Sequence, residues 1–441
     1  MTDAPPATGS PPATAAATDQ LTLTIGGATT SVPLTGGCQP FATDCQDTDL
    51  PIIDARAGAT ISIRWHDDPW YLVRGTLVSP ASPAGEYFDI QRTSPVDGFL
   101  PLSMLAAQDE YVLRLWLGRG VAPDPAVEVS PTGYAAVRLR FHSDAITLGE
   151  AAATDTLAAA SGEPGDLPGK LIVYSVESNE LRAVDRSSGR STLLTGLEGP
   201  LDPQVDGFCA DGCGASSLLW NGDSTDLWYL GAGPGVGESW HVDPTAKTPP
   251  ARDEFGEASA AVALSSDSRF LAVNRFDRLE VFDSSGHETS YSVQAAGSWS
   301  TVAAAFSPDD RTLFVANGAA IWAVVLDSTT APRLLARADP LGPSVTGLEA
   351  MADGRLVVSM TTYGNSGGVA GPTTLRVLDP AFPTTVTAVY TTEPGTRLLD
   401  ADRSGRFFIL GVWSAGYTDG ILSWTDLATV GPLAPGTDAT W

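Results

Sequence analysis

The sequence is poor in lysine and has no long apolar run. Only two of its 25 basic residues are lysine, Lys170 and Lys247, against 52 acidic residues, and the formal net charge is −27. Such a charge repels a phosphate backbone and leaves no basic stripe, which argues against a nucleic-acid partner. No segment of 18 apolar residues is present, so the sequence predicts no transmembrane helix.

Cysteine is also scarce, and the four cysteines fall in two close pairs, Cys38 with Cys45 and Cys209 with Cys213. Two short-range disulfides would explain the even number and the local clustering. A four-cysteine zinc site is the alternative, but it needs two-residue spacings, whereas these pairs are C-x6-C and C-x3-C. Disulfides predict an oxidising compartment and hence an extracytoplasmic protein, either periplasmic, on the cell surface or secreted.

Glycine and proline are abundant, at 45 and 33 residues, and many short apolar runs lie between them, as is typical of an all-β chain with frequent turns. Residues 301–327 show the repeating unit: an apolar run, the turn Ser-Pro-Asp-Asp, a second apolar run, and a third that ends in aspartate. Six third strands end in this way, with spacings of 58, 40, 44, 52 and 47 residues; they end at Asp185, Asp243, Asp283, Asp327, Asp379 and Asp426. This period is that of a four-stranded propeller blade.

Residues 170–441 are therefore predicted to form a six-bladed β-propeller. The four strands of each blade are called a to d in chain order, with strand a innermost. The first blade begins with its second strand at residues 171–176, and Trp441 aligns with Trp220 and Phe306 of later copies. The C-terminal strand is thus expected to be the innermost strand of the first blade and to close the propeller.

Successive strands of a blade run in opposite directions, so the a–b and c–d turns lie on one face of the propeller and the b–c and d–a connections lie on the other. The a–b and c–d turns are short and uniform, whereas the longest loops lie on the b–c face. Large flat side chains on loops are suited to binding. The predicted ligand-binding residues are Phe208, Tyr363, Asn365, Trp413 and Tyr417, although such aromatic residues could instead cap the cores of the blades.

The turns SPDDRTLFVANG, SSDSRFLAV and MADGRLVVS, together with strands of the pattern L-x-V-x-D, resemble the TolB-like and YVTN-type bacterial propellers. The resemblance covers about residues 170–441. It implies a non-catalytic, extracytoplasmic scaffold of the cell envelope that binds a protein or polymer ligand. TolB itself has an α/β domain before its propeller, whereas the domain here is rich in β-strands. The negative charge predicts a neutral or cationic partner.

Catalytic motifs are sparse. The sequence has no G-x-S-x-G elbow, no H-E-x-x-H and no P-loop, so we expect no enzyme activity and no cofactor. The alternative is a metal-dependent hydrolase of the lactonase kind, because such enzymes resemble this fold and hold a metal with Glu, Asn and Asp on inner strands. Glu349 is the one residue that suggests this alternative, and it could equally be an acid that lines the channel.

The N-terminal part divides into three segments. Residues 1–19 are rich in Ala, Pro and Thr and are expected to form a disordered tether, which resembles the spacer that follows a lipid anchor. Residues 20–142 predict an Ig-like β-sandwich, in which Tyr111 is either a tyrosine corner or a half-buried strand residue. Residues 143–169 form a linker that could include a loose helix. The seven strands expected in the sandwich are 21–27, 49–55, 59–65, 70–78, 99–105, 111–118 and 134–142.

One cluster in the sandwich suggests a metal site, because His66 lies beside Asp67 and Asp68. Alternation along a strand would send neighbouring side chains to opposite faces, and the following proline favours a turn. We therefore interpret this segment as the tip of a hairpin. The other three histidines are scattered singly along the chain.

Overall fold

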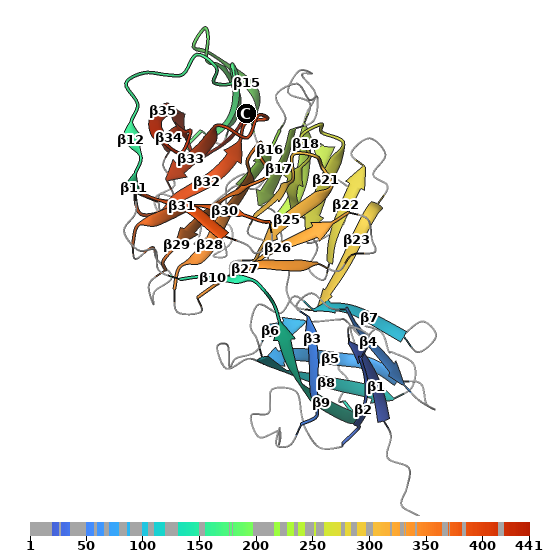
Figure 1. The fold of residues 1–441 in the computed structure, drawn as a ribbon. Coiled ribbons are helices and arrows are strands. Elements are labelled where there is room, and N and C mark those ends of the chain that lie inside the picture. Colours follow the sequence, from blue (N-terminus) through green and yellow to red (C-terminus); the bar gives the residue numbers. More distant parts are fainter. Residues whose placement is uncertain are drawn as a thin grey trace, which may run out of the picture.

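The structure is a computed structural model of the chain, and every regular element that it describes is a β-strand, as the sequence predicts (Figure 1). No helix that could span a membrane occurs in these residues. The described residues are 20–25, 28–35, 50–56, 60–65, 70–78, 86–88, 99–104, 110–119, 131–149, 155–175, 177–178, 180–196, 216–220, 227–232, 237–242, 251–252, 260–274, 278–283, 289–296, 303–317, 320–326, 330, 332–339, 342–363, 369, 371–381, 385–412 and 419–441.

The N-terminal region is a two-sheet sandwich. Leu21 and Leu23 of one sheet and Leu113 and Leu115 of the other alternate with more exposed residues and meet in one continuous core. One sheet has the order β2-β1-β4-β7, and the other has the order β3-β9-β8-β5-β6. The strands are β1 (Gln20–Ile25), β2 (Ala28–Pro33), β3 (Ile52–Arg56), β4 (Thr60–Trp65), β5 (Trp70–Val78), β6 (Glu86–Phe88), β7 (Phe99–Met104), β8 (Glu110–Arg119) and β9 (Gly133–His142).

All seven strands expected in this region are present, and β2 and β6 are additional. The two additional strands lacked a clear apolar alternation: β2 reads ATTSVP, and β6 has only three residues. Tyr111 is 1% exposed and packs edge-on against Phe141, with ring centroids 6.1 Å apart. It is therefore a fully buried core residue of β8, not a half-buried one.

Six groups of four neighbouring strands follow, and we call them the first to sixth sheets in chain order; the third continues into the sheet of β7, and the fourth, fifth and sixth each gain one more strand from the linker. In each sheet the neighbouring strands are antiparallel, which is the meander that the repeat predicts. They comprise β13 (Lys170–Ser175), β14 (Glu180–Asp185), β15 (Arg190–Gly196) and β36 (Asp438–Thr440); β16 (Ser216–Leu219), β17 (Leu227–Ala232), β18 (Gly237–Val242) and β19 (Ala251–Arg252); β20 (Ala260–Leu264), β21 (Phe270–Asn274), β22 (Arg278–Asp283) and β23 (Thr289–Ala296); β24 (Ala303–Phe306), β25 (Thr312–Ala316), β26 (Ala320–Val325) and β27 (Arg333–Ala338); β28 (Ser344–Ala350), β29 (Leu356–Thr361), β30 (Thr373–Asp379) and β31 (Thr385–Thr392); β32 (Thr396–Ala401), β33 (Phe408–Val412), β34 (Gly420–Thr425) and β35 (Thr429–Gly436).

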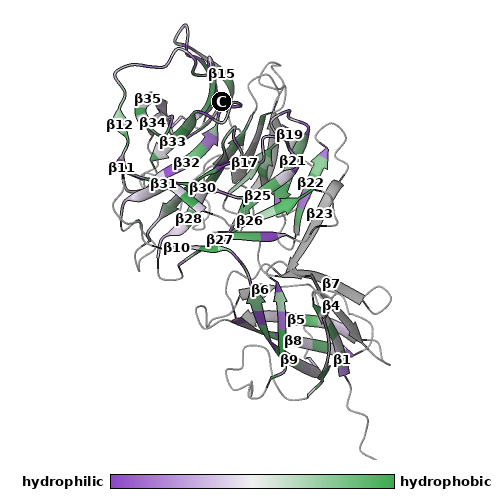
Figure 2. Cartoon of the chain, viewed as in Figure 1, coloured by the Kyte–Doolittle hydropathy of each residue, from purple (hydrophilic) through white to green (hydrophobic). Residues whose placement is uncertain are grey.

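The six sheets share their cores with their neighbours. Trp322 of the fourth sheet packs in one cluster with Val281 of the third, and Phe314 of the fourth packs in another cluster with Leu356 of the fifth. Further clusters join the fifth sheet to the sixth, the sixth to the first, the first to the second, and the second to the third. Each sheet therefore buries both of its faces against adjacent sheets, and Figure 2 shows apolar colour along most of these strands.

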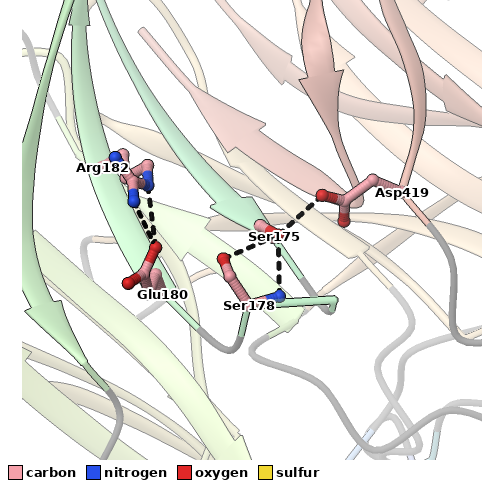
Figure 3. Close-up of polar contacts among 5 residues, drawn as sticks. All are labelled: Ser175, Ser178, Glu180, Arg182 and Asp419. Carbon is pink, nitrogen blue, oxygen red and sulfur yellow. Dashed lines mark hydrogen bonds and ion pairs between the residues drawn. The ribbon is translucent and has the colours of Figure 1, made fainter.

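The first sheet combines the start of the repeat region with the C-terminal strand. β36 pairs antiparallel with β13, with Ile172 opposite Thr440, which is the pairing that the sequence predicts. At the far end of this seam, Asp419 accepts hydrogen bonds from Ser175 Oγ (2.6 Å) and Thr437 Oγ1 (3.0 Å). Figure 3 shows Asp419 reaching across to Ser175 of the neighbouring sheet. Polar contacts thus join the sixth sheet to the first.

The linker does not form a helix in the residues that the structure describes. It adds parallel edge strands to three successive sheets: β10 (Ile146–Leu148) pairs with β27, β11 (Asp155–Thr156) with β31, and β12 (Ala158–Ala159) with β35. Leu148 is 2% exposed in the core between the fourth and fifth sheets. The small side chains of this segment suit an edge position, and a short isolated alanine-rich helix would be only marginally stable in water.

The sandwich lies at one end of the six sheets (Figure 1). β7 pairs in parallel with the last two residues of β23, Ala295 and Ala296. Because strand d of a sheet runs toward the d–a connection, this contact places the sandwich at the b–c end of the third sheet. The a–b turns lie at the opposite end.

Candidate ligand cavity at the a–b turns

A cavity of about 500 Å³ opens at the a–b end of the six sheets. Five innermost strands contribute residues to its wall, and Trp441, directly after the innermost strand of the first sheet, contributes as well. Small ligands are usually bound in cavities of this size. The wall residues from the inner strands and their ends include Leu219, Trp220, Ala263, Leu264, Ala304, Ala305, Phe306, Glu349, Ala350, Asp400, Ala401 and Trp441.

The wall is polar on one side and apolar on the other. Glu349 and Asp400 occupy the same position in the fifth and sixth sheets, one residue before the alanine that precedes the a–b turn. At that position the fourth and third sheets have Ala305 and Ala263. The repeated strands therefore set the geometry of the cavity. The fifth and sixth repeats carry an acid where the third and fourth carry alanine, and these two acids make part of the wall charged.

Asp400 is tied to the C-terminal strand. Its Oδ2 accepts hydrogen bonds from Thr440 Oγ1 (2.7 Å) and from the backbone N–H of Trp441 (2.9 Å). Burial raises the pKa of this carboxyl group to about 7, these hydrogen bonds oppose the rise, and the nearby charge of Asp438 adds to it. The side chain therefore anchors β36 and also holds a proton over part of the neutral range.

Glu349 lies beside Asp400 and has no hydrogen bond or ion pair with the described residues. Burial raises the pKa of its carboxyl group well above the usual range, and the negative charge of Asp400 raises it further. The residue keeps some exposed surface because it faces the cavity, yet protein surrounds it. A carboxyl group that faces a cavity, bonds none of the described residues and has a raised pKa is a candidate for ligand binding.

Three aromatic side chains line the cavity: Trp220, Phe306 and Trp441. Each is less than a tenth exposed. The indole N–H of Trp441 has no acceptor in the part of the chain that the structure describes, and the Arg186 guanidinium lies 6.0 Å from its ring centroid. Trp441 thus brings to the cavity wall a buried N–H group that lacks a hydrogen bond with the described residues.

The rim of the cavity is formed by the a–b turns, which are rigid for local reasons. In the turn of the fourth sheet, Ser307 Oγ donates to Asp309 (2.6 Å) and accepts from Thr312 N (2.9 Å). Asp310 occupies the left-handed region (φ 54°) and accepts hydrogen bonds from Ser266 N and Oγ in the turn of the third sheet. Neighbouring turns are therefore joined to each other as well as to their own strands.

Glycine is required at the equivalent left-handed position of the sixth sheet. Gly405 has φ 61°, and a Cβ there would lie 2.4 Å from the backbone nitrogen of Ala352 in the fifth sheet. A side chain would force the two turns apart. The glycine thus keeps the charged side of the cavity closed between the sheets that carry Glu349 and Asp400.

The described residues include one of the five predicted ligand-binding residues, Tyr363. It is 49% exposed, forms an isolated bridge with Val369 after β29, and does not line the cavity. Phe208, Asn365, Trp413 and Tyr417 lie outside the described residues, and so do the four cysteines, His66, Asp67 and Asp68. These predictions stay untested.

Glu349, which the sequence singled out, does line the cavity. Its neighbour Asp400 was missed, although aligning LEAMADGR with LDADRSGR would have placed the two acids at one position of the repeat. Among the described residues, no three His, Cys, Asp or Glu side chains come together as ligands for a metal ion.

No family model and no curated protein matches the sequence. Solved structures with a similar fold include TolB from Acinetobacter baumannii, at 12% identity and a TM-score of 0.45 over 64% of this chain and 68% of that chain. A putative TolB from Agrobacterium tumefaciens has 11% identity and a TM-score of 0.39 over 60% and 88% of the two chains.

The β-propeller domain of Cps50 (Swd1) from Myceliophteria thermophila is similar at 13% identity and a TM-score of 0.36, over 51% of this chain and 71% of that chain. These low values concern the fold alone, and we take no functional statement from them. The chain has an all-β fold, and its structural neighbours are TolB-like and other β-propeller proteins.

Proposed function

We propose that this protein is a non-catalytic binding protein whose ligand occupies the cavity at the a–b turns. The observation that carries the proposal is Glu349, a carboxyl group surrounded by protein that faces a cavity of about 500 Å³ and has no partner among the described residues. Residues of five inner strands line this cavity together with Trp441, which directly follows the sixth, so the ligand would be close to every repeat. A neutral or cationic ligand suits the net charge of −27.

The proposed architecture is a six-bladed propeller closed by the C-terminal strand and preceded by an Ig-like sandwich. The six shared cores and the pairing of β36 with β13 support it. In this arrangement the cavity is one mouth of a central channel. The b–c face, which carries Tyr363, is the other mouth and is a second candidate contact surface; the sequence predicts Phe208, Asn365, Trp413 and Tyr417 for the same face.

We further propose that the protein works outside the cytoplasm, as a component of a bacterial cell envelope. The pairing of Cys38 with Cys45 and of Cys209 with Cys213 supports this proposal through sequence spacing. Mass spectrometry of protein isolated without reductant should find two disulfides, each worth about 2–2.5 kcal/mol of loop-closure entropy. Four free thiols, or one bound zinc per chain, would remove most of the support for export.

Blocking the rim of the cavity tests the binding site. Ala352 is an exposed rim residue that lines the cavity, whereas Ala381 is an exposed alanine in the c–d turn of the same sheet and does not line it. The immobilised chain is incubated with envelope extract of the source organism, and bound molecules are identified by mass spectrometry. We expect the wild type and Ala381→Trp to retain the same ligand and Ala352→Trp to lose it.

Retention of the same ligand by Ala352→Trp would show that binding occurs elsewhere, with the b–c face as the next candidate. Non-catalytic action is tested in the same experiment, because the ligand should be recovered chemically unchanged after long incubation. Steady conversion of the ligand would favour a hydrolase instead.

A further inference from the structure

The charged side of the cavity has two carboxyl groups and no cation that neutralises them among the described residues. The charge of Asp400 raises the pKa of Glu349, and the charge of Asp438 raises the pKa of Asp400. Lys170 and Arg403 line the cavity from the start of β13 and from the a–b turn of the sixth sheet. Neither contributes to the pKa of Glu349.

The rest of the inner wall supplies no charge. The wall residues from β16, β20 and β24 are apolar or aromatic, and they include Leu219, Ala263 and Phe306. Asp402 lies in the turn beside the pair, but its Oδ1 accepts the backbone N–H groups of Arg406 and Phe407. An incoming group therefore meets two acids together with aromatic side chains from neighbouring strands, a setting in which organic cations bind well.

Building on the proposed function, we propose that the ligand of this cavity carries an organic cation, a primary ammonium or a guanidinium group, which binds between Glu349 and Asp400. Binding displaces a proton that the two carboxyl groups hold in the empty cavity, and this proton passes to solvent. The same chemistry is present in a free amine and in a lysine or arginine side chain of a protein segment.

Charge balance gives the direction of the pH dependence. A neutral acid beside a carboxylate becomes a second carboxylate when the cation binds, so one positive charge replaces one proton. Because burial raises the pKa of Asp400 to about 7 and that of Glu349 well above its usual range, the pair still holds a proton near neutrality. Affinity for the cation should therefore rise as pH increases from about 5 to 8, until the pair is fully ionised.

Isothermal titration calorimetry with the full chain tests the proposal. The probes are n-butylammonium, n-butylguanidinium, a pentapeptide with one central lysine, and n-butanol as a neutral control. Titration at pH 7 in two buffers of different ionisation enthalpy measures the protons released. We expect saturable binding of a cationic probe, release of up to one proton per cation, and affinity at least tenfold tighter than for n-butanol.

Glu349→Gln should lower the affinity for the cationic probe by at least tenfold and abolish proton release. Asp353→Asn is the matched control, because it removes one negative charge from the a–b turn of the same sheet, at a side chain that bonds Arg355 outside the cavity. It should bind as the wild type does. Asp400→Asn serves as a second test, and its melting temperature shows whether the anchor of β36 survives.

Equal binding by Glu349→Gln and the wild type, the absence of proton release, or the absence of saturable binding by every cationic probe would each overturn the proposal. If the ligand recovered from the envelope extract is neutral and Ala352→Trp still loses it, the cavity is the binding site but its ligand is not a cation. If the peptide binds more tightly than both small probes, the cationic group of the ligand is a basic side chain of a protein segment.

Discussion

The sandwich and the six repeated sheets bury their apolar residues in different ways. The sandwich has one core between two sheets, where Leu23 and Leu115 meet. The repeat region has a series of smaller cores, each shared by two successive sheets, such as the one that contains Val281 and Trp322. A defect in the sandwich should therefore remain within one domain, whereas a missing strand in the repeat region should weaken the sheets on both sides of it.

The largest expected effect comes from removing the shared strand. Deleting residues 436–441 removes Ala439 and Trp441 from the core between the sixth and first sheets and leaves β13 with an unpaired edge. The cost should be at least about 3–5 kcal/mol, the usual penalty for truncating a buried tryptophan alone. Calorimetry should show a melting temperature lower by roughly 10 °C, and light scattering should show association. An unchanged melting curve would contradict the role given to β36.

The second prediction tests whether the two regions are independent. Leu115→Ala in the sandwich and Leu313→Ala in the fourth sheet both truncate fully buried leucines. Each should cost about 2–5 kcal/mol, but only in its own region, so calorimetry should show two transitions that move separately. One transition that moves equally with both variants would show that the contact of β7 with β23 couples the regions into a single unit.

The third prediction concerns the linker strands. Leu148→Ala should cost about 2–3 kcal/mol, because this side chain of β10 is buried between the fourth and fifth sheets. Hydrogen exchange should then increase at Asp339, whose backbone N–H donates to the Leu148 carbonyl (3.3 Å). Ile146→Ala is the milder control on the same strand, since that side chain is only partly buried. If hydrogen exchange became faster only in the sandwich, the linker would stabilise the sandwich and not the fourth and fifth sheets.

The fourth prediction is a pH dependence specific to the repeat region. Folding raises the pKa of Asp400 from near 4 to about 7, so the folded chain holds more protons between those pH values, and stability falls as pH rises through that interval. Asp400→Asn keeps an acceptor for Thr440 and Trp441 but removes the titrating group. The drop in melting temperature between pH 5 and pH 8 should shrink by a few degrees in this variant.

Asp353→Asn should retain the full pH dependence of the wild type. A side-chain hydrogen bond from Arg355 lowers the pKa of Asp353. Ionisation of this carboxyl group therefore makes stability rise, not fall, as pH increases. If Asp400→Asn and Asp353→Asn show the same slope, acids other than Asp400 and Glu349 govern the response.

The smallest effect is expected at Tyr363. Tyr363→Ala should change the free energy of unfolding by less than about 0.5 kcal/mol, because the side chain is largely exposed. Cation binding in the cavity should be unchanged, since Tyr363 lies at the other end of the sheets. Loss of the ligand recovered from the envelope extract in this variant would instead move the site to the b–c face.

The strands were predictable because alternation and turn residues are local signals. The repeat placed β24, β25 and β26, and the aligned copy of Trp220 placed β36 against β13. The linker strands were not predictable in this way. Residues 155–159 read DTLAA, and their edge pairing depends on the exposed backbone of β31 and β35, which lie more than two hundred residues later in the chain.

The cavity could be predicted only in part. Glu349 stood out as an acid on an inner strand, but loop length directed attention to the b–c face, where loops are long. The a–b turns leave the cavity open because they are short, and serine and aspartate side chains such as Ser307 and Asp309 hold them close to the strands. Long loops indicate where a surface can vary, whereas a cavity between short turns must be found from the positions of the inner side chains.

The pairing of β13 with β36 also has a consequence for the order of folding. Its partners Ile172 and Thr440 are separated by 440 − 172 = 268 residues. Synthesis at about 5–20 residues per second leaves β13 without its inner neighbour for roughly 13–54 seconds. During this time the first sheet has an open inner edge and an incomplete core. The first sheet is therefore complete only when the last strand, β36, has been synthesised. A nascent chain that stalls before residue 438 should therefore be a substrate for chaperones and proteases.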